Sequence, residues 1–385
     1  MRVGFLFNHD HSHQVAHSLP IALSLASGGF KGEIVVATTR PRLAAEVLRL
    51  AGGSLPKKIE SVSLSLSGSR RRLGDAIERM VPSRKILIYG QHVDFFRGLD
   101  VLVVAEKTSL VLKSLYGLDR LKMIHTRHGA GDRAIGFDSA SARFDHVLCS
   151  GPLIRDRLVR DAGIEASRVS IVGYPKFDLL GARRNESTGV NPEETLYNPH
   201  CSPHLSSWFP HGLGVLDHFL SKPHRRLTVA PHVMLFERPF TLSIDKLRIK
   251  RPPRPALRHR QASHLSIDTG SEACTDMSYT RRAGVYLGDV SSQVYEFLLT
   301  PRPCVFLNSH RVKWQGDPNY AHWATGPVIE RPEELERGLN AAVEDHSKRY
   351  RPVQEALFAE RFDLTERPCA ERAAEVVAHI AARRQ

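Results

Sequence analysis

The chain has 385 residues, of which 42% are hydrophobic and 25% charged, and its formal net charge is +13. This length exceeds what one hydrophobic core usually supports, so we expect two domains of a globular protein. No stretch approaches the roughly 18 consecutive apolar residues of a membrane-spanning helix, which excludes that class of protein. The basic charge predicts attraction to an anionic partner. By itself it fits nucleic acid, an acidic membrane surface and phosphorylated small molecules equally well.

The first residues, "MRVGFLFNHD", turn polar after a short apolar run, which predicts a strand and not a signal peptide. Five cysteines are scattered along the chain without CxxC spacing. Two of them, Cys149 and Cys304, lie inside apolar runs that read as strands, as reduced core cysteines do. We therefore expect a cytoplasmic protein, able to bind peripherally at the inner face of the plasma membrane.

The first half of the chain alternates short apolar runs with amphipathic stretches. Continuous Val, Ile and Leu runs predict parallel strands that are covered on both faces. A helix is predicted over 41–53, with Pro41 near its start and Gly52 after its end. The pattern indicates an α/β sheet with right-handed crossovers. The predicted strands are residues 2–8, 33–39, 85–90, 100–106, 122–128, 145–151 and 168–174.

A second α/β series follows a polar stretch, residues 183–193, which is predicted to be a linker. Its predicted strands are residues 195–199, 225–232, 264–270, 284–289, 303–308 and 326–330, with helices over 331–346 and 369–384. The expected fold class is α/β, with two Rossmann-like domains facing across a cleft, the arrangement called GT-B. The predicted domains cover 1–182 and 194–352, and C-terminal helices over 353–385 are expected to dock back.

Ligands of open α/β sheets bind beyond the carboxyl ends of the strands, so residues there are the first candidates for a site. His128 follows an apolar strand, and Gly129 and Gly131 let the backbone approach a ligand closely. Histidine accepts a proton near neutral pH, so His128 is a candidate base as well as a candidate ordinary loop histidine. His232 ends a strand of the second series and would face the same cleft.

The stretch "YLGDVSSQVYEFLL", residues 286–299, carries Asp289 at a strand end and Ser291 and Ser292 at a helix start. Unpaired N–H groups and the positive end of a helix dipole suit phosphate at such a junction. Serine is also an ordinary helix cap, so a purely structural role stays open. Glu296, one turn into the helix, is either a ligand for two ribose hydroxyls or a solvated helix charge.

These stretches together resemble the CDP-glycerol glycerophosphotransferases of bacterial envelope polymer synthesis. Four blocks match in order: "RHGAGDRAIGFD" (127–138), "VGYPKFDLL" (172–180), "ETLYNPHCSPHLSSW" (194–208) and "GDVSSQVYEFLLTPRPCVFLN" (288–308). Arg133 stands where the family usually has lysine, and Gly288 and Val290 stand where it has Ser and Tyr.

The resemblance implies a transferase that moves a glycerol-phosphate or related unit from a CDP-linked donor to a polymer or lipid-linked acceptor, such as an envelope polysaccharide or teichoic acid. By this resemblance His128 would deprotonate the acceptor hydroxyl and His232 would contact the donor phosphates. Ser291 and Ser292 would hold the diphosphate, and Glu296 would face the ribose. The other implied substrate-binding residues are Gly129, Gly131, Arg133 and Asp289. No cofactor and no metal ion is expected.

The departures from the family pattern leave the transferred group open. A glycosyltransferase of capsule or exopolysaccharide synthesis, with a nucleotide-sugar donor, and a nucleotide-sugar epimerase are alternatives on the same fold. A basic run over 245–261, interrupted by prolines, fits an anionic membrane surface, a polyanionic acceptor or a solvated loop. Nucleic-acid binding is disfavoured because aromatic residues are not interleaved with the basic ones.

Histidines also cluster at 9–17 and 200–211. Their spacing matches no regular Cys/His zinc site, so metal binding is not expected there. The first cluster follows the first strand, where an acceptor-side loop would contact substrate.

Overall fold

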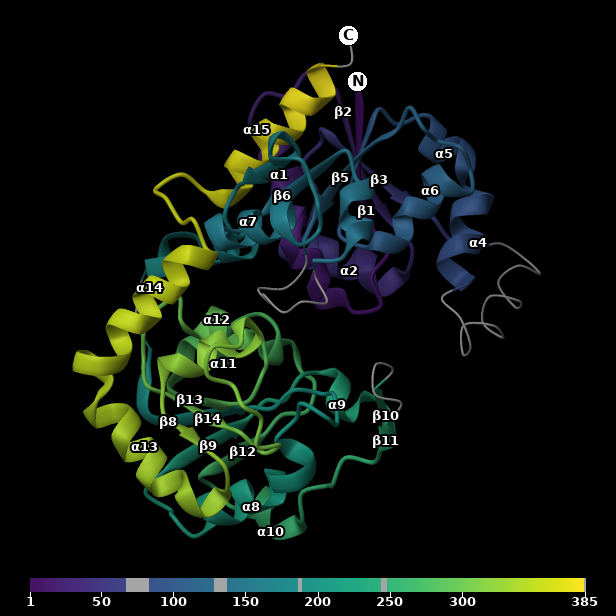
Figure 1. Cartoon of the computed structure of the whole chain (residues 1–385). Helices are drawn as coiled ribbons and strands as arrows, with labels where there is room; N and C mark the ends of the chain where they lie inside the picture. Colours follow the sequence, from purple (N-terminus) through teal and green to yellow (C-terminus); the bar gives the residue numbers. More distant parts are fainter. Residues whose placement is uncertain (67–82, 128–136, 186–188, 244–247, 384–385) are drawn as a thin grey trace. The chain divides into compact units, whose positions relative to one another are not determined.

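The structure, a computed structural model, describes residues 1–66, 83–127, 137–185, 189–243 and 248–383. Their contacts divide the chain into two compact units, each built around a parallel β-sheet (Figure 1). Unit 1 comprises the described parts of 1–184 together with 359–383, and unit 2 comprises the described part of 185–358. The predicted α/β class with two parallel-sheet domains is confirmed.

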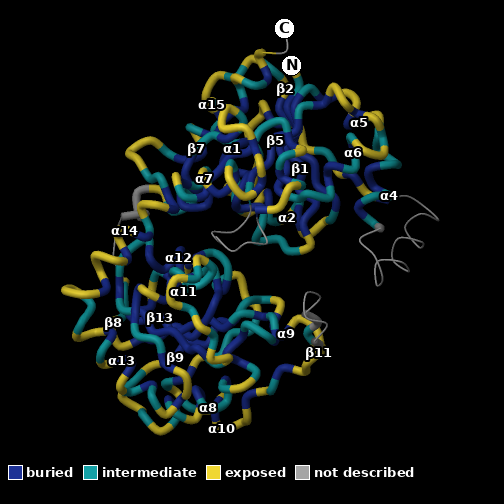
Figure 2. Tube along the Cα trace, in the orientation of Figure 1, coloured by how far each residue is buried: buried dark blue, intermediate teal, exposed yellow. Residues whose placement is uncertain are grey.

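Unit 1 contains a seven-stranded parallel sheet in the order β3-β2-β1-β4-β5-β6-β7. Its strands are β1 (Arg2–Phe7), β2 (Glu33–Thr38), β3 (Ile59–Ser63), β4 (Val101–Val104), β5 (Lys122–Thr126), β6 (His146–Cys149) and β7 (Val169–Ile171). Along β1, Phe5 and Phe7 join one hydrophobic cluster and Leu6 joins another, because successive side chains point to opposite faces. Both faces of the sheet are therefore buried, which explains the continuous apolar runs in the sequence (Figure 2).

Helices cover both faces of this sheet. The helices of unit 1 are α1 (Leu19–Ser27), α2 (Pro41–Leu50), α4 (Ser83–Gln91), α5 (Val93–Arg97), α6 (Val111–Ser114), α7 (Pro152–Arg160) and α15 (Cys369–Ala382), with 3₁₀ turns at Ser12–His17, Lys107–Leu110, Ser139–Arg143, Ala166–Arg168 and Pro175–Asn185. The last helix, α15, packs against α1, and its Ala373 and Val377 lie in the same hydrophobic cluster as β1. This confirms the predicted docking of the C-terminal helix.

Unit 2 contains a six-stranded parallel sheet in the order β12-β9-β8-β13-β14-β15 and a separate antiparallel ladder of β10 and β11. Its strands are β8 (Asn191–Asn198), β9 (Arg226–Val229), β10 (Thr241–Ser243), β11 (Arg248–Lys250), β12 (Leu265–Ile267), β13 (Ala283–Gly288), β14 (Cys304–Leu307) and β15 (Val328–Ile329). Every strand predicted for the second series is present in this sheet.

The helices of unit 2 are mostly short. They are α8 (Trp208–Leu220), α9 (Met234–Glu237), α10 (Leu257–Gln261), α11 (Ser278–Arg282), α12 (Gln293–Phe297), α13 (Leu335–Glu344) and α14 (Arg351–Arg361), with 3₁₀ turns at Glu272–Cys274, Pro318–Thr325 and Pro332–Glu334 and a π-helical turn at His346–Tyr350. Phe219 of α8 and Leu339 of α13 pack in one cluster with the central strands. The end of α14 belongs to unit 1.

The two sheets share one topological feature that locates a site. In each, the first strand of the series is central, and later strands add on both of its sides. The strand order therefore reverses between β1 and β4 in unit 1 and between β8 and β13 in unit 2. Connections diverge at such a switch point and leave room for a ligand beyond the carboxyl ends of the two strands.

Three local predictions differ from the structure. Residues 85–90, predicted as a strand, lie in α4, where Ile88 and Tyr89 are buried in the core of unit 1. A short apolar run without alternation suits a buried helix as well as a strand. Strand β3 was not predicted, and β8 begins at Asn191, inside the stretch predicted as a linker. Within the described residues, none of the helices has the length and apolarity needed to span a membrane.

Candidate functional site at the switch point of unit 2

The candidate site is formed by the loops that follow β8, β9 and β13. Asn198, the last residue of β8, connects these strands. Its amide group donates to the carbonyl oxygen of Ala230 (2.5 Å) and to the side chain of Gln293 (2.9 Å), and its side-chain oxygen accepts from the hydroxyl of Tyr286 (3.2 Å). Asn198 is fully buried, so these bonds fix the spacing of the strand ends and the start of α12.

Asp289 is the centre of a second hydrogen-bond network. Its carboxylate accepts from the backbone N–H groups of His200 (2.9 Å), Ser207 (2.6 Å) and Val290 (2.7 Å) and from the hydroxyl of Ser207 (2.8 Å). Burial raises the pKa of this carboxyl above its ordinary value, although the hydrogen bonds act in the opposite direction. With 1% exposure, the carboxylate is turned into the protein and supports the loop after β8. The role of Asp289 as a substrate contact stays a prediction.

His232 and His200 lie side by side at the ends of the neighbouring strands β9 and β8, with ring centroids 5.7 Å apart. The N–H of His232 also donates to the carbonyl of Pro199 (3.0 Å), which joins the two loops. Each ring accepts a backbone N–H at Nδ1, from Ser202 for His200 (3.0 Å) and from Met234 for His232 (3.4 Å). A neutral ring that accepts at Nδ1 carries its proton on Nε2. In that tautomer Nε2–H is the hydrogen-bond donor of each ring.

His200 was not among the predicted site residues. The signal that identified His232, a histidine just past the carboxyl end of a strand, applies equally to His200. From the sequence, the histidines at 200–211 are assessed only as a possible metal site, and none is expected there because their spacing matches no regular Cys/His site. Among the described residues, no group of three or more potential metal ligands is present.

The predicted phosphate cradle is only partly accessible. Ser291 is 1% exposed, and its hydroxyl accepts from the N–H of Gln293 (3.4 Å). Ser292 is half-buried and precedes α12, as predicted. Glu296 is 6% exposed and faces inward. Because α12 has only five residues, its dipole is weaker than that of a full-length helix, so a phosphate at this position would depend mainly on Ser292 and nearby N–H groups.

Four predicted site residues, His128, Gly129, Gly131 and Arg133, lie outside the described residues. The strand that precedes them, β5, ends at Thr126 in unit 1. Their predicted roles therefore stay predictions.

A polar cluster lies at the switch point of unit 1. His9, which directly follows β1, is fully buried, and its Nδ1 lies 3.4 Å from Glu106, after β4. Lys85 lies 3.5 Å from Glu106 and 3.2 Å from Asp10. The rings of His11 and His13 stack on each other at 5.7 Å. The histidines predicted as one acceptor-side loop therefore divide between this buried cluster and a turn of 3₁₀ helix.

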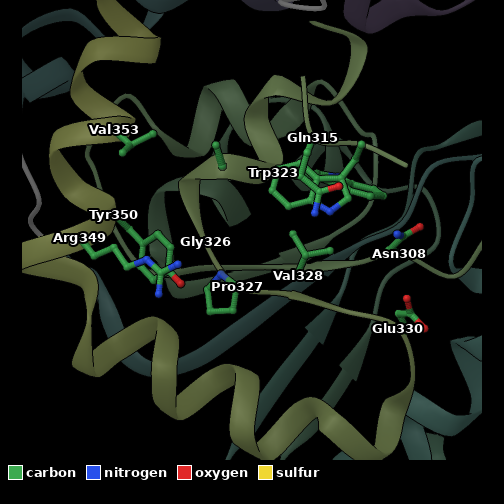
Figure 3. Close-up of a pocket in the computed structure, with 12 residues that line it drawn as sticks. Asn308, Gln315, Trp323, Gly326, Pro327, Val328, Glu330, Arg349, Tyr350 and Val353 are labelled. Atoms are coloured by element: carbon green, nitrogen blue, oxygen red, sulfur yellow. The ribbon is translucent and has the colours of Figure 1, made fainter. Parts of the chain in front are cut away.

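A cavity of about 470 Å³ opens at the outer edge of the unit 2 sheet, beside β15 (Figure 3). Aromatic and apolar side chains such as Trp314 and Val353 line it together with Arg349 and Glu330. Asn308, directly after β14, is its one lining residue at the carboxyl end of that strand. Of the predicted site residues that the structure describes, none lines this cavity.

Comparison with solved structures identifies the class of fold as GT-B. The wall teichoic acid polymerase TagF matches with a TM-score of 0.61 and 14% identity over 100% of this chain and 88% of that chain. UDP-GlcNAc 2-epimerase from Neisseria meningitidis, bound to UDP-GlcNAc, matches with a TM-score of 0.60 and 12% identity over 100% of both chains. The epimerase from Methanocaldococcus jannaschii matches with a TM-score of 0.55 and 13% identity over 100% of both chains. No family model and no curated protein matches the sequence.

Proposed function

We propose that the chain is a transferase that binds a nucleotide-diphosphate donor at the switch point of unit 2. The observation that carries this proposal is the pair His200 and His232, whose rings lie 5.7 Å apart beside the ends of β8 and β9 and each accept a backbone N–H at Nδ1. Donors held in place before the reaction offset the negative charge that develops on a leaving nucleotide. Ser292 and the N–H groups around it would supply further hydrogen-bond donors for the phosphates at the start of α12.

A CDP-linked donor is favoured. The sequence blocks resemble the CDP-glycerol glycerophosphotransferases, and the fold is similar to that of TagF, of which one structure was soaked with CDPG. In the proposed reaction an acceptor hydroxyl attacks the phosphorus of the glycerol-phosphate group, its oxygen forms the new P–O bond, and CMP leaves. His128 takes the proton of the hydroxyl. A lipid-linked acceptor would bring the chain to an anionic membrane surface.

A nucleotide-sugar epimerase is the second candidate, supported by the similarity to an epimerase bound to UDP-GlcNAc. The two proposals differ in the base of the nucleotide and in the need for an acceptor, so nucleotide preference separates them.

Calorimetric titration with CDP, UDP and GDP tests the donor site. We expect CDP to bind selectively, and His232→Ala to weaken binding about tenfold, because one hydrogen bond to a charged oxygen is lost. His224 is a matched control, since it is exposed and lies just before β9, at the opposite end of the same strand. Preference for UDP would favour the epimerase or a glycosyltransferase. Equal effects of the two histidine variants would contradict the site, as would unchanged affinity after Ser291→Ala combined with Ser292→Ala.

Release of CMP from CDP-glycerol in the presence of isolated bacterial membranes tests the base. We expect His128→Ala to lower this rate about a hundredfold or more, since general base catalysis contributes about that much. Affinity for CDP should stay close to that of the parent chain, because the base acts on the acceptor. A variant that loses rate and CDP affinity in parallel would show that His128 is not the base.

A further inference from the structure

Large apolar side chains are exposed close together around the β10–β11 ladder of unit 2. Phe240, just before β10, is 58% exposed and Ile249, in β11, is 67% exposed. In the antiparallel register Thr241 pairs with Lys250, so Phe240 and Arg251 are neighbours at the end of the ladder. We use the name hairpin patch for Phe240, Ile249, Lys250, Arg251 and Arg254, all of which are exposed.

The hairpin patch is strongly basic. Within the described residues 234–243 and 248–261 there is one acidic residue, Glu237, and there are seven Lys or Arg residues. These are Arg238, Arg248, Lys250, Arg251, Arg254, Arg258 and Arg260. One of them, Arg258, forms an ion pair with Asp217 (2.8 Å). The local charge therefore accounts for much of the basic character of the chain.

The segment after the hairpin is held in place. The indole N–H of Trp208 donates to the carbonyl of Pro253 (3.0 Å), and the guanidinium of Arg254 lies 4.9 Å from the ring of Phe236. A two-stranded ladder by itself is marginally stable in water. This one nevertheless presents two large apolar side chains to solvent, an arrangement that is typical of a surface covered by a partner.

We propose that the hairpin patch is a docking surface for an anionic lipid bilayer. Phe240 and Ile249 would enter the boundary between headgroups and acyl chains, where aromatic and aliphatic groups leave water. Lys250, Arg251 and Arg254 would lie against the negative headgroups. A nucleic acid fits this surface less well, because an aliphatic side chain such as Ile249 gains little from a phosphate backbone. The inference does not depend on the proposed transferase activity.

Co-sedimentation of the full chain with phosphatidylcholine vesicles, with and without phosphatidylglycerol, tests the proposal. We expect binding to the phosphatidylglycerol vesicles. The double variant Phe240→Glu with Ile249→Glu should lower the partition coefficient by about tenfold or more. Lys250→Glu with Arg251→Glu should lower it comparably and reduce its dependence on salt, since each basic residue near the surface contributes about fivefold.

Two control variants test whether vesicle binding requires the hairpin patch or depends only on exposed apolar and basic residues anywhere on the chain. Leu115→Glu alters a side chain that is 63% exposed in unit 1, and Lys57→Glu with Lys58→Glu reverses two exposed charges there. Both should bind vesicles like the parent chain. Tryptophan fluorescence checks that each variant of unit 2 is folded. The proposal would be overturned if the control variants lost as much vesicle binding as the patch variants. It would also be overturned if the parent chain did not bind the vesicles. Binding of a short RNA, lost in the patch variants while vesicles are ignored, would assign the surface to nucleic acid.

Discussion

Replacing Arg302 by alanine should destabilise unit 2 by about 3–5 kcal/mol, because a buried guanidinium that satisfies several carbonyl groups is lost. Arg302 is 8% exposed and donates to the backbone carbonyls of Thr280 (2.7 Å), Arg281 (2.9 Å), Ala283 (2.6 Å), Phe297 (2.8 Å) and Thr300 (3.0 Å). Burial lowers its pKa to about 10, still well above neutral, so the group stays charged.

The position of Arg302 explains why the effect should be large. Several of these carbonyls are at the ends of the short helices α11 and α12, where the helix itself leaves acceptors unpaired. The guanidinium lies 4.0 Å from the ring of Phe297, so the side chain also packs against α12. Without it, α12 and the loop that carries Ser292 lose their support.

Urea unfolding followed by tryptophan fluorescence measures this loss. The three tryptophans of the chain, Trp208, Trp314 and Trp323, all lie in unit 2, so the signal reports on that unit. Arg337→Ala is a suitable control, because this arginine is exposed and its ion pair with Glu334 joins surface residues of α13 and the turn before it. Surface pairs of this kind contribute about 0–1 kcal/mol. If the urea midpoint of Arg302→Ala matched that of Arg337→Ala, the stabilising role assigned to the Arg302 guanidinium would be contradicted.

Asp289→Asn should also cost about 3–5 kcal/mol of unit 2 stability and should reduce nucleotide affinity at least tenfold. The amide nitrogen of asparagine would face N–H donors where a carboxylate oxygen now accepts. The loop after β8 would then shift, and with it the ring of His200. The change in nucleotide affinity decides whether Asp289 positions the site, because a structural residue far from the site would alter only the free energy of unfolding.

Asp317→Asn provides the control for this variant. The carboxylate of Asp317 accepts the N–H of Asn319 (2.8 Å) at the start of a 3₁₀ turn, and its side chain is only half-buried. We expect about 1 kcal/mol or less of lost stability and no change in nucleotide binding. The same titration and urea series serve both variants. If the Asp289→Asn variant is folded and binds CDP as tightly as the parent chain, the hydrogen bonds of Asp289 do not position the nucleotide site.

The sequence was sufficient to predict the fold class because the parallel strands of both sheets are nearly continuous apolar runs. It was insufficient for residues 85–90 because that run is too short to distinguish a strand from a buried helix. It also missed β3, an edge strand in which Ile59 is the buried residue and Glu60, Ser61 and Ser63 are exposed. An edge strand has one paired side only and a weaker apolar pattern.

The sequence could predict where in the fold the candidate site would lie, but not how its side chains would be oriented. The rule for parallel sheets selects residues at strand ends, and it selected His232, which lies just past the end of β9 at Val229. The rule does not say whether a polar side chain points to a ligand or inward. For Asp289 the answer depends on Ser207, which is 82 residues away in the chain. For Ser291 it depends on how tightly the turn before α12 is packed.

The packing of α15 against α1 has a consequence for synthesis of the protein. Unit 1 takes its strands from the first part of the chain, whereas the helix that covers part of its core is made after the whole of unit 2. At the usual elongation rate, the residues between Arg184 and Cys369 take about 10–40 s to add. During that interval Val3, Leu25 and their neighbours lack the cover of Ala373 and Val377. The nascent N-terminal sheet therefore exposes part of its apolar core until α15 has been synthesised and can pack against α1.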